Sequence, residues 1–265
     1  MNKYTVSKLI IYPIKSMRGI ELDSVQVENM GFANDRRWML VDLQSQFLSQ
    51  RKYPEMALLK IQLGRDLMKV TFTKNKNSMD IPIETDSANA FQVKIWNDSV
   101  NAHSVGAKYD KWFSRCLGTD CRLVKIDKVG RQVDAEFNPI KSITGFSDGF
   151  PFLILGEESL NLLNSKLSAP VPVNRFRPNI VFSGGSPHDE DGWKQFRIGG
   201  VLFYGVKLCS RCVVTTIDQN SAEKGFEPLN TLKLYRNFNN KIMFGQNLIH
   251  EGNGIITVGD EINII

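Results

Sequence analysis

Two cysteines separated by two residues, Cys209 and Cys212, form the most reactive short pattern in the chain. Thiols at this spacing can hold a zinc ion, form a redox disulfide or present one thiolate beside a cation. A structural zinc site needs four ligands, and the chain has no second pair at this spacing. The histidines, His103, His188 and His250, show no paired spacing either. The zinc interpretation is therefore weak.

The residues around the cysteine pair favour a thiolate. A β-branched run follows Cys212 and predicts a strand over 212–217, whereas a redox pair normally opens a helix. Arg211 and Lys207 supply a positive field, which lowers the pKa of a thiol and makes its sulfur a better metal ligand or nucleophile. On these residues alone, two cysteines that only fill space in a core stay an alternative.

Three further segments combine basic residues with hydroxyl-bearing or turn-forming neighbours. They are YPIKS at 12–16, NDRRW at 34–38 and NRFRPN at 174–179. Lysine supplies a point charge, serine a neutral donor and arginine a planar fork, a combination that suits anion recognition. Each segment taken singly is also typical of a solvated surface.

Short β-rich runs must position these groups. Through the first hundred residues they alternate with Gly, Asn, Asp and Pro, a spacing that indicates an antiparallel barrel or sandwich. The strands predicted here are 8–14, 21–28, 36–42, 57–62, 67–73, 80–84 and 91–96.

The rest of the chain adds a few helices to a mainly β pattern. Apolar residues three and four apart predict an amphipathic helix over 108–117, which Gly118 ends, and further helices over 157–167 and 229–236. A parallel nucleotide-binding sheet is disfavoured because helices do not alternate regularly with strands. The remaining predicted strands are 121–126, 150–155, 179–182, 195–198, 201–208, 212–217, 254–258 and 261–265.

Composition and apolar patterning argue against a nucleic-acid-binding protein and against a membrane protein. The 265 residues include 33 Lys and Arg against 28 Asp and Glu, and a net charge of +5 spread along the chain does not favour nucleic acid. No apolar run is long enough for a signal peptide or a membrane span, so we expect a cytoplasmic protein with reduced thiols and no membrane contact. Because no linker is visible, two domains, 1–105 and 106–265, are expected to share a broad interface.

Read in order, the segments resemble the MOSC family, and the resemblance covers nearly the whole chain. It implies an N-terminal MOSC β-barrel domain packed on a C-terminal MOSC β-barrel domain. Within the family the chain is similar to the amidoxime-reducing members and their bacterial relatives, which reduce N-hydroxylated compounds. The resemblance is carried by LIIYPIKSMRGIEL, GFANDRRWMLVD, SQRKYPEMALL, FPFLILGEESLNLLN, NRFRPNIVF, CSRCVVTTID, EPLNTLKLYR, FGQNL and GIITVGDEI.

The resemblance also implies a molybdenum–molybdopterin cofactor whose metal is bound by one cysteine thiolate. It gives that role to Cys212 and leaves Cys209 as a neighbour. Gly149 and Phe150 stand where close relatives often carry hydroxyl residues, so backbone amides would replace those contacts. Pyridoxal phosphate binding, a property found at the level of the family, is not expected here. The implied cofactor-binding residues are Lys15, Ser16 and Arg36 at the phosphate end, and Asp148, Gly149, Arg177, Ser210 and Arg211.

The first functional hypothesis is therefore a molybdenum oxidoreductase that reduces small N-hydroxylated substrates. The chain carries no Cys-rich ferredoxin-like extension and no haem attachment motif. We accordingly expect a separate electron-donor protein of the ferredoxin, flavin or haem type. The alternatives are a sulfur carrier with a persulfide on Cys212 and a non-catalytic cofactor-binding module.

Overall fold

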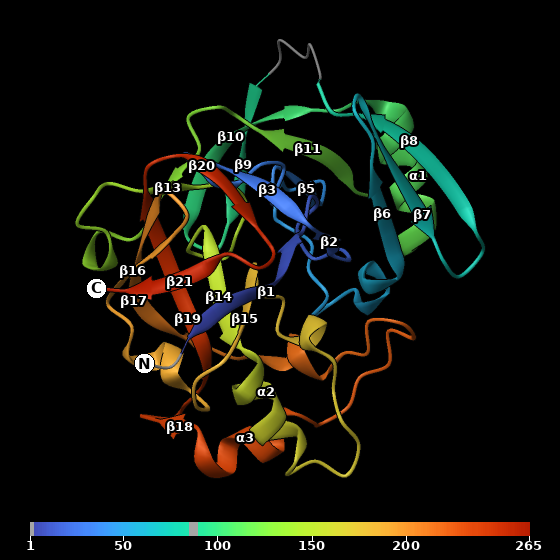
Figure 1. Cartoon of the computed structure of the whole chain (residues 1–265). Helices are drawn as coiled ribbons and strands as arrows, with labels where there is room; N and C mark the ends of the chain where they lie inside the picture. The colour runs from blue at the N-terminus through green and yellow to red at the C-terminus, as the bar shows by residue number, and fades with distance from the viewer. Residues whose placement is uncertain (1–2, 85–89) are drawn as a thin grey trace.

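The computed structural model describes residues 3–84 and 90–265. These residues form mostly short strands, with three α-helices among them: α1 (Ala107–Leu117), α2 (Glu157–Asn164) and α3 (Leu229–Tyr235) (Figure 1). The predicted class, mainly β with a few helices, is confirmed. None of the helices in the described ranges is long and apolar enough to cross a membrane.

Seven strands close into a barrel. Each strand pairs with the next, and the last pairs back with the first. All pairs are antiparallel except β14 with β15, which is parallel. Large aromatic side chains such as Phe152, Phe196 and Phe203 fill the interior. The order around the barrel is β14 (Phe152–Gly156), β15 (Ile180–Ser183), β1 (Tyr4–Ile11), β21 (Glu261–Ile264), β16 (Gln195–Ile198), β17 (Val201–Ser210) and β19 (Lys241–Glu251).

Short strands and smaller sheets complete the fold. Strand β2 (Ile20–Leu22) pairs with β1, and β18 (Asn237–Phe238) pairs with β19. One sheet has the order β5 (Trp38–Val41), β11 (Arg122–Ile126), β10 (Asp98–Ser104), β9 (Ala90–Ile95). The others are β6 (Leu59–Leu63), β7 (Leu67–Phe72) and β8 (Asn77–Pro82); β20 (Gly254–Thr257), β3 (Ser24–Glu28) and β4 (Gly31–Phe32); and β12 (Arg131–Gln132) with β13 (Ile143–Thr144).

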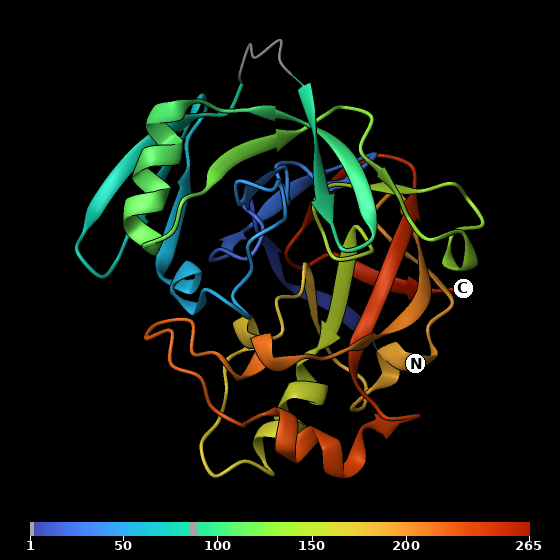
Figure 2. The same ribbon diagram turned by 180° about the vertical axis from the view of Figure 1, so that it is seen from behind.

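Helix α1 has the amphipathic form that its sequence predicts. It packs against β11 and β8 (Figure 2), and Tyr109 and Phe113 bury their rings in the same core as Leu40 and Leu123. Gly118 ends the helix in the left-handed conformation, with φ of 64°. Cys116 is partly buried against this core, and all four cysteines are free thiols.

The prediction of a strand over 212–217 is wrong. Strand β17 ends at Ser210, and Val213–Thr216 form a 3₁₀ helix, η5. The Thr215 hydroxyl donates to the Cys212 carbonyl at 3.0 Å, and the Thr216 hydroxyl donates to the Val213 carbonyl at 2.8 Å. Such local bonds compete with strand pairing and favour a turn in spite of the β-branched sequence. The turn carries Cys212 off the sheet.

Strand β19, the longest in the described residues, was not predicted. Gly245, Gln246 and Asn247 interrupt its apolar pattern, and such residues usually indicate a loop. Gly245 has φ of 76°, and a Cβ there would lie 2.8 Å from the Ile154 carbonyl oxygen. The close approach of β14 therefore requires glycine at this position.

Both ends of the chain contribute to the barrel. Strand β1 lies between β15 and β21, and β3 pairs with β20. The barrel therefore mixes strands from before and after residue 105. The domain boundary near Val105 stays a prediction.

Candidate functional site

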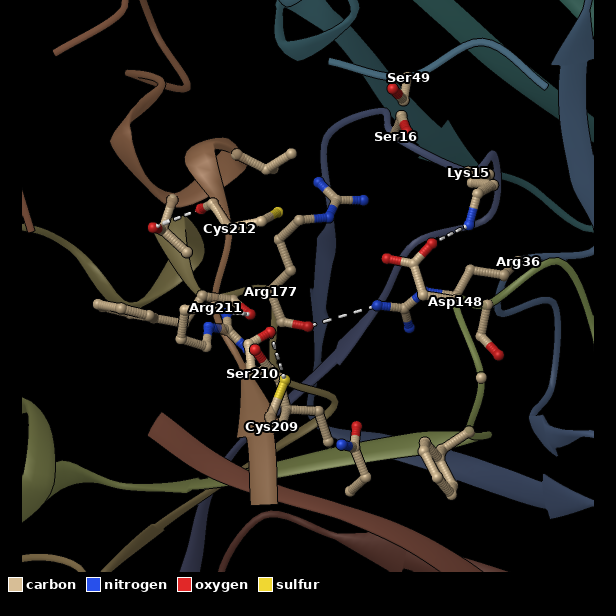
Figure 3. A pocket seen from close by; sticks show the side chains of 18 of the residues that line it. Lys15, Ser16, Arg36, Ser49, Asp148, Arg177, Cys209, Ser210, Arg211 and Cys212 are labelled. Atoms are coloured by element: carbon tan, nitrogen blue, oxygen red, sulfur yellow. Dashed lines mark hydrogen bonds and ion pairs between the residues drawn. The ribbon is translucent and has the colours of Figure 1, made fainter. Parts of the chain in front are cut away.

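All the residues predicted to bind a cofactor line one pocket (Figure 3). The pocket has an empty volume of about 890 Å³, part of which is open to solvent. Strands β14, β17 and β19 and the loop after β1 supply its walls. The predicted residues in the pocket are Lys15, Ser16, Arg36, Asp148, Gly149, Arg177, Ser210, Arg211 and Cys212, and their roles toward a cofactor stay predictions.

One buried ring brings two of the basic segments together. Tyr12 is 1 % exposed, and the Cζ atoms of Arg36 and Arg177 lie 4.5 Å and 4.2 Å from its ring centroid. Its hydroxyl donates to the Pro178 carbonyl at 3.1 Å. Burial raises the pKa of Tyr12 to about 12, so the ring stays neutral. Cation–π attraction to this neutral ring holds both guanidinium groups at the pocket.

Three of the predicted residues have an unusual backbone conformation. Ser16, Arg36 and Arg177 have φ of 67°, 48° and 57°, in the left-handed region that side chains other than glycine rarely adopt. The Arg36 amide donates to the Tyr12 carbonyl at 2.9 Å, and its carbonyl accepts from the Phe146 amide at 2.8 Å. Backbone strain of this kind often gathers at binding sites, where surrounding structure maintains it.

One part of the pocket, the lysine end, consists of Lys15, Ser16, Arg36 and Asp148. The buried Lys15 ammonium donates to the Phe146 carbonyl at 2.8 Å and to Asp148 Oδ1 at 2.6 Å. Burial lowers the pKa of Lys15 to about 8 in spite of this ion pair. Burial alone would raise the pKa of Asp148, but Lys15 holds it well below its usual range.

Arg36 completes the charge pairing at the lysine end. Its Nη1 atom donates to Asp35 Oδ2 at 2.6 Å and to Asn179 Oδ1 at 3.0 Å. Each cation at this end therefore has a carboxylate partner. A Cβ on the nearby Gly149 would meet no heavy atom within 4 Å, so the backbone there faces open space.

The opposite part, the thiol end, consists of Cys212, Arg51, Arg177 and Arg211. Cys212 precedes η5, and its Sγ accepts from Arg51 Nη2 at 3.5 Å. Cys209 lies on β17, and its Sγ accepts from Arg211 Nη1 at 2.8 Å. The two thiols thus lie on different elements and contact different arginines.

The arginines at the thiol end lack carboxylate partners. Within residues 3–84 and 90–265, Arg51, Arg177 and Arg211 make no ion pair, although Arg175 beside them pairs with Asp218. Arg177 instead donates to the Met17 carbonyl at 2.7 Å, and Arg211 donates to the Phe176 carbonyl. Burial lowers the pKa of Arg177 to about 10, which leaves it charged at neutral pH. Uncompensated guanidinium groups in a pocket favour an anionic ligand.

The residues present fit a phosphate-bearing cofactor that contains a soft metal. A thiolate at Cys212 is a soft ligand, and the surrounding cations suit phosphate oxygens. In the described part of the chain, no three His, Cys, Asp or Glu side chains form a group that could hold a metal ion.

Sequence reasoning missed several residues that line or border the pocket. Arg51 and Asn247 line it, and Trp96 contacts three of its residues. Arg51 lies within SQRKYPEMALL and Asn247 within FGQNL, two of the segments that carry the family resemblance. Their place in these segments is the sequence signal that could have identified Arg51 and Asn247, since neither residue belongs to a short chemical motif.

Comparisons with known proteins agree with the fold. Residues 3–120 match the family model described as the MOSC N-terminal beta barrel domain, and residues 142–263 match the MOSC domain. The chain is 32 % identical to mitochondrial amidoxime-reducing component 1 from Homo sapiens, a match that covers 98 % of this chain and 83 % of that protein.

Two other matches cover less of the related protein or show weaker similarity. Molybdenum cofactor sulfurase from Solanum lycopersicum is also 32 % identical, but the match covers 98 % of this chain and only 36 % of the sulfurase. The crystal structure of the YUAD protein from Bacillus subtilis covers 99 % of this chain at 12 % identity, with a TM-score of 0.43, a likeness too weak to inform the site. From the two domain matches and the near full-length identity to the human protein, we conclude that this chain belongs to the MOSC family, with a MOSC N-terminal β-barrel domain followed by a MOSC domain.

Proposed function

We propose that this protein binds a molybdenum cofactor in the pocket and reduces small N-hydroxylated compounds with electrons from a separate donor protein. The observation that carries the proposal is the thiol of Cys212 in a pocket where three arginines form no ion pair with any described residue. The likeness to amidoxime-reducing component 1, which extends over most of both chains, supports this reaction class.

The two ends of the pocket suggest how such a cofactor would be held. Lys15, Ser16 and Arg36 would bind its phosphate, since a lysine, a hydroxyl and an arginine supply complementary donors. The thiolate of Cys212 would bind molybdenum as a soft ligand. The other predicted contacts to the pterin are Asp148, Gly149, Arg177, Ser210 and Arg211.

Reduction of an N-hydroxyl group consumes two electrons and two protons and releases water. The cofactor, when bound, supplies the redox chemistry for this conversion. The chain's own side chains orient the substrate and provide positive charge around it. The electrons would come from a ferredoxin-, flavin- or haem-type donor.

A sulfur carrier is the second candidate. The match to molybdenum cofactor sulfurase covers 98 % of this chain, although the chain spans about a third of the sulfurase. A persulfide on Cys212 would be anionic, and Arg51 lies beside that sulfur. A non-catalytic cofactor-binding module is the third candidate.

Metal analysis and assay of the same sample separate these functions. The protein is produced in cells that synthesise the cofactor, and benzamidoxime reduction is measured with a chemical electron donor. Stoichiometric molybdenum with amidine formation is expected for the reductase. Metal-free protein with a persulfide on Cys212, detected by mass spectrometry, would instead support the sulfur carrier. Bound molybdenum without amidoxime reduction would support the non-catalytic cofactor-binding module.

A further inference from the structure

Arg51 reaches the thiol end from a separate part of the chain. It lies in the loop before the 3₁₀ helix η1 (Pro54–Leu58) and lines the pocket. One of its five N–H donors contacts Cys212 Sγ, at a nitrogen–sulfur distance of 3.5 Å. Its guanidinium makes no other hydrogen bond within the described residues. Most of its donors are therefore free for a ligand.

Trp96 fixes the position of this guanidinium. Arg51 Cζ lies 4.6 Å from the Trp96 ring centroid, a cation–π distance. Trp96 Nε1 donates to Asp148 Oδ1 at 3.2 Å, and the indole packs on Phe47 with a centroid distance of 5.0 Å. Trp96 occupies the turn between β9 and β10 with φ of 55°. Three contacts thus hold a ring whose residue is 47 % exposed.

Arg51 is itself only partly buried and lies beside the exposed ring of Trp96. The nearest carboxylate in this network, Asp148, already accepts from Lys15 and from Trp96. Lys15, in contrast, is buried and uses two of its three N–H donors on Phe146 and Asp148. Arg51 is therefore a positioned cation that lines the pocket and forms no ion pair within the described residues.

We propose that Arg51 determines substrate specificity by binding an anionic group of the substrate, so that N-hydroxylated compounds with a carboxylate are preferred to neutral ones. The inference rests on the reductase function proposed above and names its substrate class. A guanidinium binds a carboxylate through two parallel hydrogen bonds, which gives both affinity and orientation. Trp96 is a positioning residue in this arrangement, since it acts through Arg51.

Two probes with the same reacting group test the proposal. Benzamidoxime and 4-carboxybenzamidoxime differ only in a carboxylate, and kcat/KM is measured for each with the molybdenum-loaded protein. The parent should favour the carboxylate probe. Arg51→Gln should lower the ratio of the two kcat/KM values by about 10- to 100-fold, the effect of losing charge-assisted hydrogen bonds, chiefly through KM.

Matched variants separate a direct contact between Arg51 and the substrate from a general effect of positive charge near the pocket. Lys52→Gln removes the same charge at the next position, on an exposed side chain that lies over Tyr53, and should keep the parent ratio. Trp96→Phe should stay closer to the parent than Trp96→Ala, because a smaller ring still supports the guanidinium. An equal loss for both probes in Arg51→Gln would overturn the proposal, as would a parallel loss of molybdenum, which would assign Arg51 to the cofactor.

Direct binding distinguishes failure of this inference from failure of the proposed function. The affinity of the molybdenum-loaded parent and of Arg51→Gln for 4-carboxybenzamidine and benzamidine is measured by calorimetry. Tighter binding of the carboxylate compound to the parent alone supports the inference even where neither amidoxime is reduced, an outcome that rejects only the reductase. Equal binding by parent and variant rejects the inference while leaving amidoxime reduction intact.

Discussion

The lysine end and the thiol end of the pocket both contain cations, but these cations differ in whether they pair with carboxylates. At the lysine end, Lys15 pairs with Asp148 and Arg36 pairs with Asp35. At the thiol end, Arg51 and Arg177 bind no carboxylate in the described structure. The first end is thus internally balanced, and the second keeps a net positive charge that a ligand must compensate.

This difference suggests that the two ends of the pocket have different functions. Groups already fixed by ion pairs and buried hydrogen bonds keep their geometry without a ligand, as retention of a cofactor requires. Uncompensated charges interact most strongly with groups that carry negative charge, such as a thiolate or an anionic substrate. Variants at the lysine end should therefore change how much cofactor is retained, and variants at the thiol end should change what the loaded protein does.

The largest effect is expected at Cys212. Cys212→Ser should lose molybdenum-dependent amidoxime reduction by on the order of 1,000-fold or more, because a serine hydroxyl is a hard and protonated group at neutral pH. Cys209→Ser should keep most of the activity and the metal. Activity and molybdenum content are measured after circular dichroism has established that both variants fold. An inactive Cys209→Ser beside an active Cys212→Ser would reverse the ligand assignment.

The next effect is expected at Arg36. Arg36→Ala should weaken cofactor retention by about 10- to 100-fold, since a charged hydrogen bond to phosphate is lost. Molybdenum and phosphate content per chain are measured after gel filtration, with thermal unfolding as a check on the fold. Arg65→Ala, an exposed site outside the pocket, serves as the control. Full cofactor content in Arg36→Ala would remove this residue from the phosphate site.

A smaller, pH-dependent effect is expected at Lys15. Because burial lowers its pKa to about 8, the folded ligand-free protein carries a charged Lys15 below that pH and a neutral one above it. Affinity of the cofactor-free protein for inorganic phosphate should therefore fall as pH rises above about 8, by up to about tenfold per unit. Calorimetric titrations across this window measure the slope. Lys15→Arg should abolish it, and an unchanged slope in that variant would contradict the assignment.

The stability of the ligand-free protein should change in the opposite direction. Between the folded pKa of about 8 and the ordinary value of 10.5, the unfolded chain binds more protons at Lys15 than the folded chain does. The contribution of this residue to the free energy of unfolding therefore rises with pH in that window. Urea unfolding of the parent and of Lys15→Arg compares the two slopes.

The smallest effect is expected from the hydroxyl that supports the Cys212 turn. Thr215→Val removes its hydrogen bond to the Cys212 carbonyl and should cost about 1 kcal/mol of stability, with a several-fold loss of activity. Thr216→Val removes the equivalent bond to Val213 and should cost similar stability with less effect on activity. Urea unfolding and amidoxime reduction measure both quantities. Equal activity in the two variants would show that the turn does not position the thiol.

The sequence predicted the elements whose side chains alternate or repeat regularly. Helix α1 and strands such as β7 (Leu67–Phe72) have this regularity, because one face of each is buried and the other is solvated. Strand β19 and helix η5 were missed because contacts distant in sequence or local hydroxyl bonds outweigh their composition. Pairing with β14 and β17 makes a strand of residues that are unfavourable in isolation.

The sequence identified the pocket residues that belong to short motifs. Lys15, Arg36 and Cys212 belong to such motifs, and the structure brings them into one pocket. Arg51 and Trp96 do not, since a single arginine and a single tryptophan are common on any surface. What distinguishes them is their tertiary contacts: Arg51 contacts the Cys212 sulfur, and Trp96 packs on Arg51. The left-handed backbone at Arg36 and Arg177 is likewise a tertiary property that residue type does not indicate.

The position of β1 between β15 and β21 has a consequence for how the protein is made. During synthesis Tyr4–Ile11 emerge long before one of their hydrogen-bonded neighbours, Glu261–Ile264. Such distant pairing gives the barrel a high contact order, and the ring of strands closes only after translation of the C-terminal strand. A ligand that needs both walls of the pocket must therefore bind after residues distant in sequence have been translated, and residues 142–263 expressed alone would leave a gap where β1 belongs.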